Sequence, residues 1–428
     1  MRNSYLMERN LVGRHDSGPA SLIEKRMQVV PHLRVTPLEI ELIGKIRRAG
    51  EITKADLVSN TIYSRSKISS CIAGLVNRKF IKPAGAGGYT GGRRSVKFSV
   101  NGDLGLVAGV DIGATSIDIV LADLSGKICA RYGEPASIRE GPVAVLDRVC
   151  VLLDQMIGGI GWKTDHLFGI GIGVPGPVDF MLGTVFSPPI MPGWDSFPIV
   201  QTVQDRYPIA RAVVDNDVNV MALGEKYRGL GKELQNFIFV KIGTGIGAGI
   251  ICSGEIYRGN NGCAGDIGHI SVKKDGPLCP CGNSGCLEAM AAGPAIAERG
   301  VKAALDGSSP ILKKHYDTNG GRLRAEDVGL AAGEGDAASI EIIRSSGQMI
   351  GDVLAGLVNF YNPGMIVIAG GVSNLGNLLL SSIRQAVLSR SLPLATRDLQ
   401  IVFSAIGADA GVVGAMMLAI ENVFLVNA

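Results

Sequence analysis

The sequence has few aromatic residues and no stretch that reads as a membrane span. Phe, Trp and Tyr make up 5% of the 428 residues, whereas glycine occurs 59 times. This balance is typical of an α/β protein with many tight turns, and the length indicates about three domains. The run from Val353 to Ile383 has no charged residue but contains Asn359, Asn362 and Pro363. It therefore predicts a helix, a turn and a buried strand.

Residues 1–30 also lack the apolar core of a signal peptide, since charged residues occur throughout them. We therefore expect the protein to stay in the reducing cytoplasm, where isolated cysteines are usually small buried side chains and clustered ones favour a metal. Five of the eight cysteines are isolated, namely Cys71, Cys129, Cys150, Cys252 and Cys263. A disulfide framework is not expected.

The other three cysteines lie close to a histidine, in the run from Gly268 to Glu288. One imidazole and three thiolates suit a closed tetrahedral zinc site that leaves no position for water. The predicted ligands are His269, Cys279, Cys281 and Cys286. Carboxylates flank the cluster at Asp266 and Glu288. The pattern predicts a metal loop beside a small-molecule pocket, and a chance cluster of residues in a loop is the alternative.

The net charge of +3 conceals an uneven distribution. Residues 1–100 contain 18 Lys and Arg against 7 Asp and Glu, a net charge of +11, which leaves −8 for the rest of the chain. A basic head on an acidic body indicates that the head binds nucleic acid. Taken alone, the charge would also fit a solvated basic face.

The head has the pattern of three short helices. The run from Thr36 to Glu39 combines a capping hydroxyl, a proline and a glutamate in the order of a capping box. Further helices are expected to begin after Thr53 and Ser64. Three such helices predict a helix-turn-helix unit, whose later helix enters the major groove of DNA. Its contacts would come from Ser64, Arg65, Ser66, Lys67 and Ser69.

Residues 95–100 alternate like a strand and follow a glycine-rich segment that contains Arg93 and Arg94. Two strands with a basic tip would form a β-wing, so that Arg93 and Arg94 reach phosphate or the minor groove. We assign residues 36–100 to a winged helix-turn-helix domain and residues 1–35 to an N-terminal arm. A three-helix interaction module is the alternative.

From residue 105 onward, apolar strands alternate with glycine-rich turns. A strand, a Gly/Thr turn and a second strand occur over residues 106–124 and again over residues 237–251. This repeat suggests two α/β lobes with a cleft between them. Glycine-rich turns let backbone N–H groups approach phosphate. The candidate phosphate-loop residues are Gly113, Ala114, Thr115, Gly243, Thr244, Gly245 and Gly247.

Another strand ends in polar residues at Asn216 and Asp217. Residues at the carboxyl end of a strand in an open α/β sheet usually face the ligand crevice. There Asp217 could act as a general base and Asn216 as the partner of a hydroxyl group. An Asx turn or a helix cap is the alternative use of this pattern.

These motifs, taken in order, resemble the ROK family (repressors, open reading frames and sugar kinases) over roughly residues 105–425. The segment from His269 to Glu288 carries the family's zinc signature, and Asn216-Asp217 is similar to its Asn-Asp pair. The resemblance implies an α/β, two-lobed sugar-kinase/actin-like (RNase H-like) body. Its parts would be lobe 1 at residues 105–225, lobe 2 at residues 226–409, and a C-terminal helix at residues 410–428 that returns to lobe 1.

The resemblance also implies roles for single residues. In the kinases, the aspartate of the pair deprotonates the attacking sugar hydroxyl, and zinc is structural, holding the histidine so that its imidazole can also contact the sugar. Gly113–Thr115 and Gly243–Gly249 resemble the phosphate loops, and Ala369–Gly371 the turn beside the adenosine. The implied sugar-binding residues are Asn216, Asp217, Asp266, His269 and Glu288.

Two departures from the kinase pattern bear on activity. Ala114 stands where the first phosphate loop of the kinases usually has glycine, and its Cβ can crowd a phosphate. Asp266 stands where the kinases commonly have glutamate, so its shorter carboxylate should hold a sugar differently. The head is absent from stand-alone kinases and is similar to that of the family's transcriptional repressors.

We therefore predict a sugar-responsive, DNA-binding transcriptional regulator, in the first place a repressor of carbohydrate-metabolism genes. It would bind operator DNA as a homodimer or homotetramer, with a sugar or amino-sugar effector and structural zinc. The alternative is an ATP- and Mg²⁺-dependent hexose or N-acetylhexosamine kinase, with Asp217 as its base and an appended DNA-binding domain. A regulator controlled by a protein partner is a third possibility. The sequence does not identify the sugar, the operator or the sign of regulation.

Overall fold

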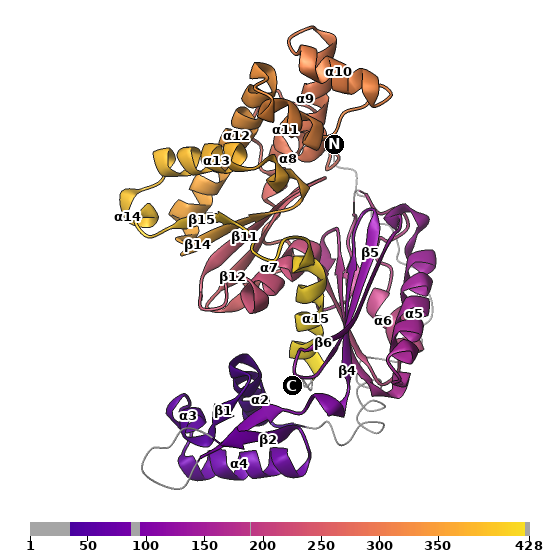
Figure 1. The fold of residues 1–428 in the computed structure, drawn as a ribbon, viewed down its shortest axis with the longest axis vertical. Helices are drawn as coiled ribbons and strands as arrows, with labels where there is room; N and C mark the ends of the chain where they lie inside the picture. The colour runs from indigo at the N-terminus through magenta and orange to yellow at the C-terminus, as the bar shows by residue number, and fades with distance from the viewer. Residues whose placement is uncertain (1–34, 87–94, 189, 424–428) are drawn as a thin grey trace, which may run out of the picture.

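The computed structural model describes residues 35–86, 95–188 and 190–423. Within these ranges the chain forms a small head and two α/β lobes, each built on a five-stranded sheet (Figure 1). The predicted α/β class is confirmed. No helix in the described ranges is both long and apolar enough to span a lipid bilayer. The run without charges begins with the end of a helix, a turn at Asn362 and a buried strand, as predicted. It then continues into a 3-10 helix (Gly371–Leu375) and the start of another helix, which were not predicted.

The head begins with three helices whose first residues follow capping side chains. Thr36, Thr53 and Ser64 each accept a hydrogen bond from the backbone N–H three residues on, which satisfies a donor that the helix itself leaves unpaired. Thr36 and Thr53 also form capping boxes, with Glu39 and Asp56 respectively. The helices are α2 (Pro37–Ala49), α3 (Lys54–Ser59) and α4 (Arg65–Asn77).

A three-stranded antiparallel sheet completes the head. It consists of β1 (Ile52–Thr53), β3 (Val96–Val100) and β2 (Ile81–Ala86), with β3 in the centre. Three helices followed by a β-hairpin give the element order of a winged helix-turn-helix. The tip between β2 and β3, with Arg93 and Arg94, lies outside the described residues, as do residues 1–34 of the expected arm.

The two larger sheets have the same topology. In each sheet, the first three strands along the chain pair antiparallel to one another. The fourth strand then pairs with the free edge of the first, and the fifth with the fourth, both in parallel. The repeat seen in the sequence thus corresponds to two sheets with equivalent strand orders. In lobe 1 the order is β10 (Arg211–Asn216), β7 (Leu167–Val174), β4 (Leu106–Ile112), β5 (Ser116–Asp123) and β6 (Ile128–Pro135). In lobe 2 it is β15 (Gln400–Phe403), β14 (Met365–Ala369), β11 (Phe237–Ile242), β12 (Ile246–Cys252) and β13 (Glu255–Tyr257).

Helices cover both sheets. In lobe 1, α5 (Pro142–Gly159) and α6 (Ile199–Arg206) lie on one face and α15 (Ala410–Val423) on the other (Figure 1). Helix α7 (Asp217–Arg228) lies between the lobes, against α15 and β12. Lobe 2 carries α8 (Leu287–Ala291), α9 (Gly293–Leu305), α10 (Pro310–Thr318), α11 (Ala325–Gly333), α12 (Ala337–Tyr361), α13 (Asn377–Arg390) and α14 (Pro393–Thr396). The domain limits drawn from the sequence remain predictions.

Helix α15 packs against the first sheet at glycines. A Cβ at Gly171 of β7 would lie 2.0 Å from the carbonyl oxygen of Ala415, and one at Gly414 would lie 1.7 Å from that of Val220 in α7. Backbones approach this closely only where no side chain intervenes. The position of α7, and of the residues at its start, therefore depends on α15.

The head is joined to lobe 1 by one continuous apolar cluster. It includes Leu42 and Ile46 of α2 together with Met416 and Ile420 of α15, all buried. A buried apolar contact of this kind gives the head a defined position relative to lobe 1.

Replacing Gly171 with alanine is expected to lower the free energy of unfolding by about 1–3 kcal/mol, because the added methyl group would overlap the Ala415 carbonyl oxygen. Gly158→Ala, in the last turn of α5, is the matched control, because a Cβ at Gly158 would have no atom within 4 Å. Urea denaturation measures both variants. Equal stability of the two would contradict the close packing of α15.

Candidate functional site

Asn216 is the last residue of β10 and the N-cap of α7. Its side-chain oxygen accepts hydrogen bonds from the N–H groups of Val218, at 2.9 Å, and Asn219, at 3.4 Å. Its amide donates to the carbonyl oxygen of Gly176 at 2.9 Å. The helix-cap interpretation is therefore confirmed. The amide has a second N–H, which a sugar oxygen could accept, so the cap is compatible with a binding role.

Asp217 lies buried in the first turn of α7 and forms an ion pair with Lys241 of β11. Burial disfavours the charge of Lys241, but the carboxylates of Asp217, Asp111 and Glu288 together outweigh this effect and raise the pKa of Lys241. Burial, and then the charge of Asp217, raises the pKa of Asp111 at the end of β4 to about 7, although Lys241 opposes this. Charged groups from both lobes thus meet around Lys241.

Lys241 and Asp111 had no predicted role as site residues. The sequence does contain one indication of a role for Lys241, because it is the only charged residue in the otherwise apolar strand Phe237–Ile242. A half-buried lysine in a strand needs a counter-ion, and the partner of Lys241 comes from a different element, α7.

The first glycine-rich turn joins β4 to β5. Its Gly113 N–H donates to the carbonyl oxygen of Ser116 at 2.9 Å, while the carbonyl oxygens of Ala114 and Thr115 accept from Ile138 and Ala136. Backbone groups therefore hold the turn on both sides.

The second glycine-rich turn, Gly243 to Gly245, joins β11 to β12 and contains Thr244. The N–H of Ile246 just after it donates to Oε2 of Glu288 at 3.0 Å, so the turn holds one of the predicted sugar-binding carboxylates. Gly247 lies against Val218 of α7, where a Cβ would be 3.0 Å from a methyl group.

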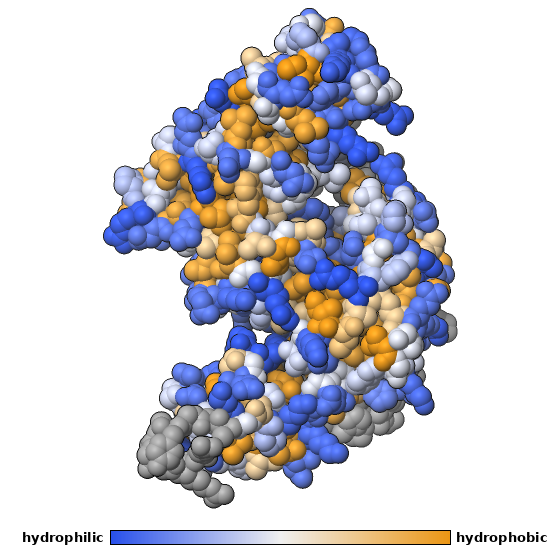
Figure 2. Space-filling model, in the orientation of Figure 1, coloured by the Kyte–Doolittle hydropathy of each residue, from blue (hydrophilic) through white to orange (hydrophobic). Residues whose placement is uncertain are grey.

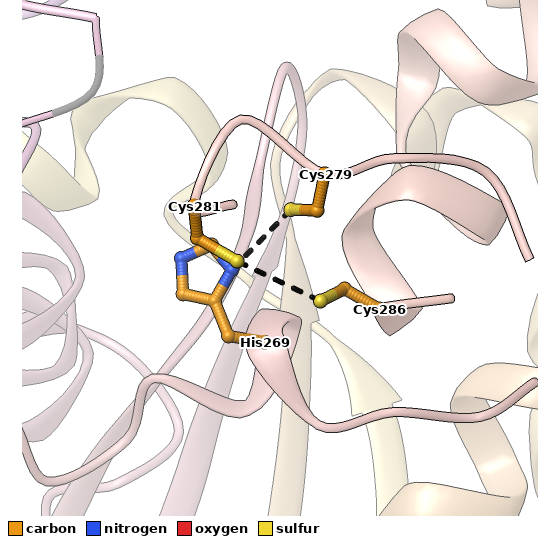
Figure 3. Close-up of side chains that lie close together, drawn as sticks. All are labelled: His269, Cys279, Cys281 and Cys286. Carbon is orange, nitrogen blue, oxygen red and sulfur yellow. Dashed lines mark hydrogen bonds between the residues drawn. The ribbon is translucent and has the colours of Figure 1, made fainter. Parts of the chain in front are cut away.

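Four potential metal ligands converge between the short 3-10 helix η5 (Ile267–His269) and α8 (Figure 3). Their ligand atoms lie within 4.8 Å of one another. The distances are 3.6 Å from Cys279 Sγ to His269 Nδ1 and 3.7 Å from Cys281 Sγ to Cys286 Sγ. Tetrahedral zinc, with Zn–S bonds of about 2.3 Å and Zn–N bonds of about 2.0–2.1 Å, requires separations of roughly 3.6 and 3.8 Å. The cluster therefore fits a tetrahedral metal.

Glycines shape the loop that carries these cysteines. Gly282 and Gly285 have φ angles of +91° and +69°, and a Cβ at Gly285 would lie 1.7 Å from the Lys273 carbonyl oxygen. The Asn283 amide is placed to donate to Cys281 Sγ at 3.6 Å, an arrangement that stabilises a thiolate.

The metal cluster lies between two predicted sugar-binding carboxylates. Asp266 precedes η5, and Glu288 is in the first turn of α8, whose N-cap is Cys286. Partial desolvation raises the pKa of Asp266, His269 opposes this, and the charges of Glu288 and Asp217 add to it. The space-filling view shows a hollow between the lobes (Figure 2).

In the head, the residues predicted to contact DNA lie at the start of α4. Ser64 to Lys67 are exposed, and the Lys67 ammonium lies 4.7 Å from the centre of the Tyr63 ring. The Ser69 hydroxyl is half-buried and donates to the Arg65 carbonyl oxygen at 2.7 Å, so it is less available than the others.

Comparison with known proteins relates this geometry to a family. A glucokinase of Halalkalibacterium halodurans is 34% identical over 307 residues, which cover 72% of this chain and 92% of that protein. The xylose repressor of Bacillus subtilis is 28% identical over 382 residues, which cover 89% of this chain and 94% of the repressor. The match to the repressor therefore spans more of the chain than the match to the kinase.

A crystal structure of a ROK family transcriptional regulator, a homologue of the Escherichia coli Mlc protein, has a TM-score of 0.76 at 24% identity. The match covers 93% of this chain and 97% of that one, so the two share a fold. The predicted two-lobed, sugar-kinase-like architecture with a helical head is therefore confirmed. Residues 107–422 match the profile of the ROK family, and with these similarities the chain belongs to that family.

Proposed function

We propose that this protein is a sugar-responsive transcriptional regulator, and specifically a repressor of carbohydrate-metabolism genes. The observation that carries the proposal is the combination of two parts in one chain. The residues predicted to bind sugar come from both lobes, with Asn216 and Asp217 at the start of α7 and Asp266, His269 and Glu288 beside the metal cluster. An exposed basic helix start lies in a head that packs on lobe 1. Similarity to a xylose repressor over 89% of the chain supports the combination.

The effector would be a neutral sugar or amino sugar. Carboxylates of Asp217, Asp266 and Glu288 would accept hydrogen bonds from its hydroxyls, and the amide of Asn216 would donate one. If His269 binds the metal through Nδ1, its Nε2–H remains for another sugar oxygen.

Zinc is the metal that we propose for the histidine–cysteine cluster. Its ligands would be His269, Cys279, Cys281 and Cys286, and four protein ligands leave no position for a reacting water. Zinc would thus join η5 to α8 and keep Asp266 and Glu288 in place.

A kinase is the second candidate, supported by the glucokinase similarity and by the two glycine-rich turns. With ATP and Mg²⁺, Asp217 would be the general base for a sugar hydroxyl. Two observations weigh against this role. Asp217 is already paired with Lys241, and Ala114 lies in the first phosphate turn.

Helix α7 offers a route from the sugar to the head. It begins at Asp217, and near its end the Tyr227 hydroxyl donates to the carboxylate of Glu421 in α15. Burial lowers the pKa of Arg47 in α2 to about 10, and Glu421 is the charge that opposes this. Sugar binding would act on DNA by favouring one arrangement of these contacts. A homodimer or homotetramer would present two heads to a palindromic operator.

Sugar sensing predicts binding without turnover. Full-length protein would be heated with glucose, xylose or N-acetylglucosamine, and saturation at about 100 times Kd would add about 2.7 kcal/mol of stability. The same sugar should change operator affinity about 5–150-fold at fixed salt. With ATP and Mg²⁺ no ADP should form. ADP formation that is lost in Asp217→Asn would instead support the kinase.

Binding of DNA by α4 predicts an electrostatic signature. Arg65→Ala with Lys67→Ala should flatten the plot of log affinity against log salt by about 2, one for each phosphate that the variant no longer neutralises. Fluorescence anisotropy with operator DNA measures the slope. Lys302→Ala, at an exposed position of α9 in lobe 2, is the control and should leave it unchanged. An unaltered slope in the double variant would remove α4 from the interface.

The zinc assignment predicts one metal ion per chain. Cys286→Ser removes a buried ligand, so it should abolish stoichiometric zinc in mass spectrometry and lower the melting temperature by several degrees. Cys129→Ser, at an exposed cysteine of β6, should change neither quantity. Zinc retained in full by Cys286→Ser would be incompatible with the proposed ligand set.

A further inference from the structure

Arg258 follows β13 in lobe 2, yet its side chain extends to lobe 1. Its Nε–H donates to Oδ2 of Asp215 in β10 at 2.8 Å. Its guanidinium carbon lies 3.8 Å from the centre of the Phe180 ring, within cation–π distance. The Asp215 side chain is 2% exposed, so this ion pair is buried on its acidic side.

Asp215 connects this contact to the sugar site. Its other oxygen, Oδ1, accepts from the backbone N–H of Asn216 at 2.8 Å and from the side-chain amide of Asn219 at 3.0 Å. Both carboxylate oxygens are therefore used, one toward Arg258 and one toward the start of α7. The orientation of Asn216 and Asp217 depends on this carboxylate.

Phe180 connects the same guanidinium to a hairpin of lobe 1. It lies in the turn between β8 (Val178–Asp179) and β9 (Thr184–Val185). Just before β8, the carbonyl oxygen of Gly176 accepts the hydrogen bond from the Asn216 amide. Arg258 thus contacts both segments that hold Asn216.

The loop that carries Arg258 leads directly to the sugar-binding residues of lobe 2. It lies against β8, since a Cβ at Gly262 would be 2.1 Å from the Val178 carbonyl oxygen. It then returns to lobe 2, where the Ala248 N–H donates to the Gly265 carbonyl oxygen at 2.8 Å. Asp266 follows immediately.

We propose that Arg258 is a positioning residue that ties the sugar-binding residues of lobe 1, Asn216 and Asp217, to those of lobe 2, Asp266 and His269. The inference rests on the proposed sugar site and deepens it. Arg258 acts through Asp215 and Phe180. Without the guanidinium, Asp215 is a buried charge that lacks its ion-pair partner. The contact that fixes the two halves of the site relative to each other is then lost.

The test uses full-length Arg258→Met, which keeps an unbranched chain but removes the charge. Calorimetry with glucose, xylose or N-acetylglucosamine should give about ten-fold weaker binding for the sugar that binds the wild type, equivalent to about 1.4 kcal/mol. Small-angle X-ray scattering of the sugar-free variant should report a larger radius of gyration. Arg258→Lys, which restores the charge, should recover part of the affinity.

Arg206→Met is the matched control. Arg206 also pairs with an aspartate, Asp154, and lies 5.9 Å from the ring centre of an aromatic residue, Tyr207, but all three are in lobe 1. This variant should leave both sugar affinity and scattering as in the wild type.

Each result has a defined meaning. A merely structural role would lower the melting temperature of Arg258→Met while leaving sugar affinity and scattering like those of the control, and this would overturn the proposal. If no sugar binds even the wild type, the proposed function fails, and the scattering difference alone decides whether Arg258 joins the lobes. If Arg258→Met does not fold, Arg258→Lys and Phe180→Leu are measured in the same way, and wild-type behaviour of both would refute the role.

Discussion

The close contact between α7 and α15 is the constraint on which the rest of the structure depends. A Cβ at Gly224 of α7 would lie 2.2 Å from the Ala410 carbonyl oxygen, and one at Gly414 of α15 would lie 1.7 Å from that of Val220. The two helices therefore meet backbone to backbone at both points. Protein interiors are packed almost without free volume, so such a pair moves as a unit rather than absorbing a displacement.

This unit has the proposed sugar site at one end and the head at the other. Asp217 begins α7, while Glu421, near the end of α15, interacts with Tyr227 of α7 and with Arg47 of the head. Burial raises the pKa of Glu421, and Arg47 is the largest influence in the opposite direction. Glu421 is half-buried between α7, α15 and the head, so a small shift between these helices would change its contacts. In our proposal, sugar binding changes DNA affinity through this contact.

Local patterns explain which parts of the fold could be predicted, and long-range pairs explain what was missed. Helix starts at Thr36, Thr53 and Ser64 were predictable because a cap and its donor are three residues apart. Most of the metal ligands likewise lie within one short loop. Lys241 and Arg258, by contrast, are separated by 24 and 43 residues from the aspartates that they meet. No periodicity indicates such partners, because they depend on how the two sheets face each other.

The charges around Asp217 favour sugar binding over phosphoryl transfer. A general base must accept a proton, but protonation of Asp217 would remove the partner of the half-buried Lys241. Ala114 narrows the approach to the first phosphate turn, where the kinases usually have glycine. Each of these features acts on the phosphoryl donor or on the proton transfer. None removes a hydrogen-bonding group from the hydroxyls of a neutral sugar, so binding could persist in a body that no longer phosphorylates.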